Sequence, residues 1–155
     1  MREDEFSSYL DSFIREFSVE VASNYGIPES AALEQVKREM ASDLPDGIHT
    51  AGQVLTCLVD ATQTPERLVG YLWYRQDLAA QVAFIMDFSI FPAYQGQGFG
   101  KQALMALEQD LKRKGFAQIK LRVAPDNQRA RHVYDVTGFR VTGIHMSKPL
   151  DRNRA

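Results

Sequence analysis

The sequence predicts an α+β domain in which two helices precede a series of short strands that alternate with two further helices. Apolar residues recur every three or four positions between Phe6 and Met40, which is the spacing of one helix face. From Gln53 onward, short runs rich in β-branched and aromatic residues replace this spacing. A length of 155 residues, with 45% hydrophobic and 25% charged side chains, suits one globular domain and excludes a disordered or fibrous chain.

Two helices are expected before residue 50. The first carries apolar residues from Phe6 to Tyr25 on one face and ends at Gly26, before Pro28. The second is shorter, directs Val36 and neighbouring apolar residues inward, and stops at the turn over residues 44–47. The aromatic residues of the first helix are expected to belong to a core rather than to a ligand site.

Strands and helices then alternate to the end of the chain. Helices are expected over residues 101–114 and 127–137, with Gly115 and Gly138 as their stops. Strands are expected over residues 54–59, 68–74, 81–91, 118–124, 139–141 and 144–147. No repeat or low-complexity linker interrupts this pattern, so residues 1–155 are predicted to form a single domain.

Composition excludes several functional classes. No apolar run approaches the roughly 20 residues that span a bilayer, and the acidic N-terminus lacks the apolar core of a secretion signal. Cys57 is the only cysteine, and the three histidines lie far apart without metal-ligand spacing. We therefore expect a cytoplasmic, metal-free protein without a membrane partner.

Charge is distributed unevenly along the chain although the net charge is only −2. Residues 1–50 hold 11 acidic and four basic side chains, a net charge of −7, and residues 51–100 carry −2. Residues 101–155 hold five acidic and 12 basic side chains, a net charge of +7. The asymmetry either reflects solvated helix faces or marks one end of the chain as a surface that meets an anion.

The segment most informative about function is a glycine-rich loop over residues 95–100, between an expected strand and an expected helix. Glycines at alternate positions allow a tight turn, and the exposed N–H groups at the positive end of a helix dipole bind anions. A Walker loop would need glycine at Gln95 and Ser or Thr at Gln102, and a dinucleotide fingerprint would need glycine at Lys101. Both alternatives are therefore excluded, while a purely structural turn stays open.

A second informative segment begins at Asn127. Asn127, Ala130 and Tyr134 recur at helical spacing and so project near one face. A small residue at position 130 allows close approach of an elongated molecule, and Tyr134 places a phenol on the same side. Taken alone, this could also be an amphipathic helix whose tyrosine caps the core.

Together the two segments resemble the GNAT superfamily of acyl-CoA-dependent N-acetyltransferases. Gln95-x-x-Gly98-x-Gly100 is similar to the pyrophosphate-binding motif of the family, and Pro92-Ala93-Tyr94 precedes it as expected. The helix from Asn127 through Ala130 and Tyr134 to Gly138-Phe139 is similar to its second motif. The resemblance covers residues 67–147 and implies a mixed, mostly antiparallel sheet with splayed central strands, flanked by helices. GNAT domains usually begin with an edge strand, which this chain lacks or has shortened.

The resemblance also implies a site. Acetyl-CoA, as co-substrate, would lie between the splayed strands at residues 81–91 and 118–124, within an acetyl-CoA-binding core over residues 81–139, with the helical residues 1–50 on the acceptor side. Tyr134 would protonate the departing CoA thiolate. The implied cofactor-binding residues are Phe88, Ser89, Ile90, Gln95, Gly96, Gln97, Gly98, Phe99, Gly100, Lys101, Asn127, Ala130 and Tyr134.

Other residues have alternative roles in such a site. Asp87 could act as the general base or could anchor the backbone where the strands part. Cys57 is expected to be a core residue rather than a nucleophile, because acyl transfer in this family is usually direct. Tyr71, Trp73 and Tyr74 could line an acceptor pocket or pack in the core. Lys101, Arg129 and Arg131 could contact CoA phosphates or lie in solvent.

The expected function is transfer of an acetyl group from acetyl-CoA to a primary amine of a small molecule or protein. A non-catalytic CoA-binding or regulatory module of the same fold is the alternative. A nucleic-acid partner is disfavoured because the basic residues are scattered among core positions and the pI is about 5.9. A homodimer is compatible with the sequence, which identifies neither the acceptor nor the oligomeric state.

Overall fold

The computed structural model describes residues 1–150 and divides into two compact units. The first unit comprises Met1 and Ala51–Arg140. The second comprises Arg2–Thr50 together with the chain from Val141 onward. No helix of residues 1–150 is both long enough and apolar enough to cross a membrane.

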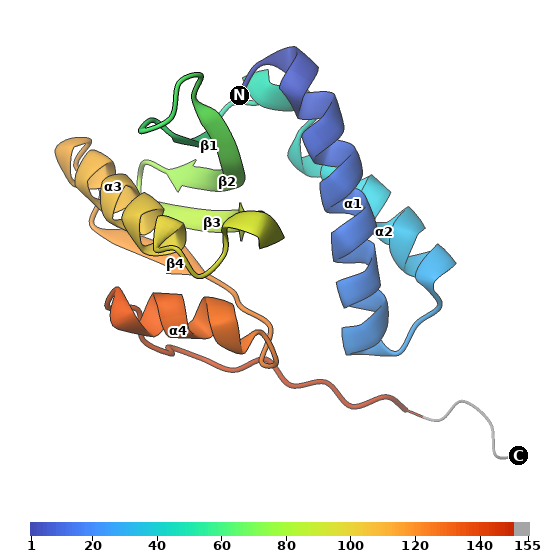
Figure 1. Ribbon diagram of the computed structural model, residues 1–155. Helices are drawn as coiled ribbons and strands as arrows, with labels where there is room; N and C mark the ends of the chain where they lie inside the picture. Colours follow the sequence, from blue (N-terminus) through green and yellow to red (C-terminus); the bar gives the residue numbers. More distant parts are fainter. Residues whose placement is uncertain (151–155) are drawn as a thin grey trace, which may run out of the picture. The chain divides into compact units, whose positions relative to one another are not determined.

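The first unit is built on a four-stranded sheet (Figure 1). Its strands are β1 (Gln53–Asp60), β2 (Arg67–Asp77), β3 (Val82–Ile90) and β4 (Gln118–Leu121), and they lie in this order across the sheet. The first three form an antiparallel meander, whereas β4 pairs parallel to β3. The sheet is therefore mixed and mostly antiparallel, as the sequence predicts.

The two central strands of the predicted site pair over only part of their length. Parallel pairing joins Val82 to Gln118 and ends where Ile85 meets Leu121. β3 continues to Ile90 along β2, while the chain after Leu121 leaves the sheet before Pro125. β4 is thus shorter than the predicted strand over residues 118–124, and its early end opens the sheet beside the last residues of β3.

A register shift lies in β3 at the beginning of this opening. Trp73 of β2 pairs with Asp87, but the next residue, Tyr74, pairs with Ile85, so Met86 is an additional residue in β3. A bulge of this kind bends the strand and changes the face to which the following side chains point. Ile85 and Phe88 consequently both contact the same hydrophobic core although they are separated by an odd number of positions.

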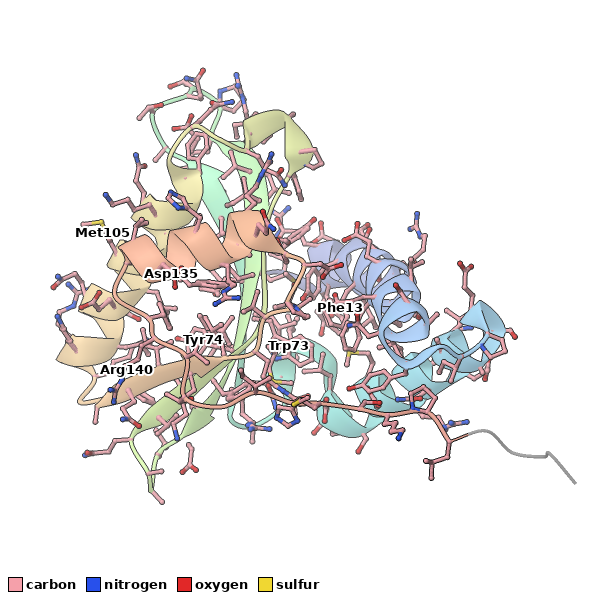
Figure 2. The ribbon with its side chains drawn as sticks, turned by 90° about the horizontal axis from the view of Figure 1, so that it is seen from below. Phe13, Trp73, Tyr74, Met105, Asp135 and Arg140 are labelled. Atoms are coloured by element: carbon pink, nitrogen blue, oxygen red, sulfur yellow. The ribbon has the colours of Figure 1, made fainter. Side chains whose placement is uncertain are left out.

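Helix α3 (Phe99–Arg113) packs its apolar stripe on one face of this sheet (Figure 1). Leu104, Leu107 and Leu111 of the helix are buried with Leu72 and Tyr74 of β2. Met105 points away from the sheet on the outer side of α3 and is half exposed (Figure 2). Helix α4 (Gln128–Val136) contributes Tyr134 to the same core.

The second unit is a helical pair. α1 (Glu3–Tyr25) begins with three acidic residues, which favour the positive end of the helix dipole, and ends at Gly26 in the left-handed conformation. α2 (Glu29–Asp43) packs against it, and a short 3₁₀ turn, η1 (Gly47–His49), follows. Both helices confirm the predicted pattern, and α1 is the first element of the described chain.

The predicted C-terminal strands are wrong. Residues 139–141 and 144–147 form no strand, and no backbone hydrogen bond joins residues 140–150 to another residue within positions 1–150. Val141, Ile144 and Met146 are 61%, 80% and 92% exposed. Apolar alternation gives a segment the potential to pair, but a strand also needs a neighbouring ladder, and this segment has none in the described chain.

Candidate active site

The glycine loop leads from the end of β3 into α3 through a short 3₁₀ turn, η2 (Pro92–Tyr94). Gly96 and Gly98 have φ values of 76° and 86°, a conformation that glycine adopts without steric cost. Gly98 is the N-cap of α3, and its carbonyl accepts the first helical hydrogen bond, from Gln102 N at 3.0 Å. The loop therefore turns as the sequence predicts and leads directly into the helix.

Six consecutive backbone N–H groups of this loop, at residues 96–101, donate no hydrogen bond to any residue in the described chain. Three of them belong to the first turn of α3, where no carbonyl lies in position to accept. They lie at the positive end of a 15-residue helix. This cluster of free donors can bind a polyanion such as a pyrophosphate.

The Gln95 N–H is not part of that cluster, because it points to the Pro92 carbonyl at 3.4 Å. The Gln95 side chain instead makes two contacts. Its Nε2 donates to the carbonyl of Ile90 at 2.9 Å, and its Oε1 accepts from a guanidinium nitrogen of Arg129. Sequence reasoning missed both contacts, and no local pattern signals the second, since Gln95 and Arg129 are 34 residues apart.

The N-cap residue Asn127 fixes the start of helix α4. The Asn127 Oδ1 accepts from Ala130 N at 3.2 Å, as is usual for an asparagine cap. This contact leaves the Asn127 Nδ2 as the donor that can reach a ligand. Ala130 is half-buried and packs on the core of the first unit, and Arg131 is exposed on the same helix.

Tyr134 is the buried side chain of α4 and is only 8% exposed. Its ring lies 6.4 Å from that of Phe88 on β3 and 5.5 Å from that of Phe139, measured between centroids. Within residues 1–150 its hydroxyl has no hydrogen-bond partner, yet it is not sealed from solvent. Burial, and secondarily the charge of Asp87, raise the pKa of Tyr134 to about 12, so the phenol is neutral at physiological pH.

Residues 88–90 form the β3 side of the opening. They pair with β2 through Leu72, Tyr71 and Gly70, while their other side has no strand neighbour in the described sheet. Asp87 pairs with Trp73, and since neighbouring residues alternate, its side chain and that of Phe88 lie on opposite faces. The charge of Asp87 nevertheless contributes to the raised pKa of Tyr134.

The aromatic residues of β2 differ in their burial. Tyr74 is buried beneath α3 and Trp73 is 1% exposed, with its indole N–H donating to the side chain of Gln53 at 2.7 Å. Tyr71 is half-buried and meets the ring of Phe91 edge-on at 5.3 Å. Cys57 is half-buried in the wall of a cavity of about 410 Å³ between β1, β2 and α3.

The structure thus brings the two sequence motifs together. A methyl group built on Gly100 would lie 3.7 Å from Val133 of α4 and 3.9 Å from Phe88 and Ile90 of β3. The start of α3, the middle of α4 and the end of β3 therefore converge. Free backbone donors, an open strand edge and a neutral phenol surround this point.

Comparison with known proteins agrees with this geometry. The model of the Acetyltransferase (GNAT) family matches residues 16–139. The chain belongs to the GNAT acetyltransferase family. Members of this family use acetyl-CoA as co-substrate for transfer to an acceptor amine.

Individual relatives support this assignment. The chain is 36% identical over 154 residues to the uncharacterized N-acetyltransferase YycN of Bacillus subtilis (strain 168), a match that covers 97% of this chain and 96% of the relative. A crystal structure of YycN superimposes with a TM-score of 0.88 at 33% identity, over 98% of this chain and 96% of that one. A Pyrococcus furiosus structure with a TM-score of 0.65 and 22% identity, covering 92% and 95% of the two chains, shares the fold.

Proposed function

We propose that this GNAT protein transfers an acetyl group from acetyl-CoA to a primary amine by direct attack in a ternary complex. The observation that carries the proposal is the state of Tyr134. It is a nearly buried, neutral phenol whose hydroxyl has no partner in the described chain, and it stands where the glycine loop, α4 and β3 converge.

The donor would bind along the opening in the sheet. The free side of residues 88–90 offers backbone groups to the amides of pantetheine, in the manner of an added strand. The N–H groups of residues 96–101 would hold the pyrophosphate, and Asn127 would donate to pantetheine through Nδ2. Ala130 leaves room for the arm, and Lys101 and Arg131 are exposed cations available to the phosphates.

The chemistry needs a neutral amine, a thioester carbonyl and a stabilised leaving group. The amine nitrogen forms a bond to the carbonyl carbon, the C–S bond breaks, and the products are an amide and CoA thiol. In this proposal Asp87 accepts the proton lost by the amine, directly or through water. Tyr134 donates its hydrogen bond to the sulfur and protonates the departing thiolate.

The raised pKa of Tyr134 refines this role. An ordinary thiol has a pKa near 8.5, so a phenol with a pKa of about 12 is the weaker acid of the two. The main contribution of Tyr134 is therefore a strong hydrogen bond to sulfur as negative charge develops. After Tyr134 protonates the thiolate it regains a proton from solvent, and Asp87 releases to solvent the proton that it took from the amine. The charge of Asp87 helps to keep Tyr134 protonated. In this proposal Asp87 is therefore the base and Tyr134 the acid.

Replacing Tyr134 by Phe tests this proposal. We expect Tyr134→Phe to lower kcat by roughly 10²- to 10³-fold, which is the usual cost of losing one transition-state donor. The affinity for CoA should stay within about twofold, because the hydrogen bond from Tyr134 to sulfur becomes strong only as negative charge develops on the leaving group. Cys57→Ala is the matched control, and its kcat should be unchanged if attack is direct. Equal kcat values for wild type and Tyr134→Phe would contradict the role of Tyr134.

The same assay separates an enzyme from a binding module. Thiol release from acetyl-CoA would be followed with a polyamine, an amino acid, an aminoglycoside and a peptide with a free amino terminus. Release with at least one amine is expected. A CoA-dependent thermal shift without thiol release from any amine would instead identify a non-catalytic CoA-binding protein, and absence of CoA binding would remove the basis of both.

A further inference from the structure

One side chain connects three segments of the candidate site. The amide of Gln95 donates to the carbonyl of Ile90, the last residue of β3, at 2.9 Å, and accepts from Arg129 in the first turn of α4. Gln95 itself is the first residue of the glycine loop. The strand that borders the donor opening, the loop and the helix that carries Tyr134 are therefore joined through one amide.

The acceptor in the contact with Arg129 is a neutral amide oxygen. Arg129 is exposed and forms no ion pair with any residue of positions 1–150. An exposed hydrogen bond to an uncharged acceptor contributes little to overall stability. Its structural consequence is instead local, since it holds α4 and the loop in one relative position.

A second contact also holds α4 against the loop. Val133, one helical turn after Arg129, lies against Gly100 at the start of α3. The side of α4 that meets the loop is thus held at both Arg129 and Val133, and Tyr134 follows directly. A shift of α4 relative to the loop would move the Tyr134 hydroxyl relative to any thioester whose pyrophosphate the loop holds.

We infer that Gln95 is a positioning residue, which, through its bridge to Arg129, aligns Tyr134 on α4 with the pyrophosphate loop. This inference rests on the proposed function, because it assigns to Gln95 a place in the same donor site. It differs from a direct role of Arg129 at the CoA phosphates, for which the partner Gln95 would be irrelevant. The two roles predict different behaviour when both residues are changed.

A double-mutant cycle tests the inference. Gln95→Met keeps the length of the side chain and Arg129→Met keeps its apolar stem, and both remove the polar end. We expect Arg129→Met to lower kcat/KM for acetyl-CoA by about fivefold, the usual loss for one hydrogen bond, and Gln95→Met, which also loses the bond to Ile90, by at least as much. The double variant should lose no more than Gln95→Met alone, rather than the product of the two single losses, because the bridge is already broken in that variant. The KM for the amine and the Tm should stay at their wild-type values, which a general loss of structure would not permit.

Arg131→Met is the matched control, since Arg131 is exposed on the same helix and forms no bond to the loop in the described chain. Its effect should multiply with that of Gln95→Met. Multiplying effects for Gln95→Met and Arg129→Met would overturn the inference and leave the proposed function intact. Failure of the wild-type protein to bind CoA in a calorimetric titration would instead overturn the proposed function, and the inference with it.

Discussion

Tyr134 combines two properties that a surface tyrosine lacks. It is 8% exposed, and the charge of the Asp87 carboxylate also disfavours its ionised form. Both effects act against the phenolate, so they add rather than cancel. The side chain therefore stays protonated up to a pH of about 12, which lies above the usual pKa of a primary amine.

The same residue should make stability depend on pH in alkaline solution. The pKa of Tyr134 is about 12 in the folded protein and about 10 in the unfolded chain. Below pH 10 both states are protonated and the stability is fully present; as the pH rises from 10 to 12, only the unfolded chain loses its proton and stability is lost. Relative to Tyr134→Phe, we expect the free energy of unfolding of wild type to fall by about 2–3 kcal/mol across this window.

Urea unfolding of the two proteins at several alkaline pH values measures this difference. Comparison with Tyr134→Phe removes the contributions of lysines and of the other tyrosines, which both proteins share. Parallel stability curves from pH 9 to 12 would show that Tyr134 has an ordinary pKa.

At the scale of single residues, the sequence predicted local backbone conformations better than contacts between distant side chains. The left-handed conformations of Gly96 and Gly98 follow from the need for a tight turn, and the cap at Asn127 follows from its side chain. The bridge between Gln95 and Arg129 could not be predicted, because it depends on how α4 lies beside the loop. A contact between two polar side chains far apart in sequence has no periodic signature.

Among the elements, β3 forms one side of the donor opening, and its pairing with β2 is unusually close at one point. A methyl group added to Gly70 would lie 2.0 Å from the carbonyl oxygen of Ser89 and 3.1 Å from the Cα of Ile90. Both are backbone atoms, which a side-chain rotation cannot move away. Only glycine permits this approach of β2 to the residues that border the opening.

Replacing Gly70 by Ala should therefore separate the two strands locally. We expect a loss of about 2–3 kcal/mol in the free energy of unfolding, in the range of overpacked sites. Gly143→Ala is the control, because a methyl group there would meet nothing within 4 Å and its effect should be near zero. Urea unfolding measures the stability of both variants. Equal stability of Gly70→Ala and wild type would show that β2 and β3 can move apart without loss of stability.

The helices and strands also show which elements sequence patterns predict well and which they do not. Helices α1, α2, α3 and α4 were predicted to within a few residues because each carries its own apolar stripe and its own stop signals. The predicted strand over residues 118–124 ran past the end of β4 at Leu121, since Val123 continues the alternation after the ladder has ended. Whether a β-prone segment pairs is decided by its neighbours, which an isolated pattern does not contain.

For the molecule as a whole, the distribution of charge is more informative than its total of −2. Residues 101–155 carry a net charge of +7, and α4 and β4, which border the donor opening, belong to them. A polyanionic donor would be attracted to such a surface over distances comparable with the Debye length. The assignment of the acidic residues 1–50 to the acceptor side stays a prediction.

Ionic strength should therefore weaken donor binding. Raising the salt concentration from 0.01 M to 0.5 M should raise the KM for acetyl-CoA by roughly tenfold, through screening of attraction to the phosphates. S-acetylpantetheine, which has no phosphate, is the matched control, and its KM should be nearly independent of salt. The same salt dependence for both donors would show that the basic residues do not contact the phosphates.

The order of strands in the sheet also bears on how the molecule folds. Short turns at positions 61–66 and 78–81 connect β1 to β2 and β2 to β3, whereas positions 91–117, which include the whole of α3, separate β3 from β4. Closing a short loop costs less chain entropy than closing a long one, so the antiparallel meander can form early. The parallel pairing of β3 with β4, and with it the opening between these strands, is then expected to form late. We thus expect the polypeptide to assemble last the part of the molecule that would bind the donor.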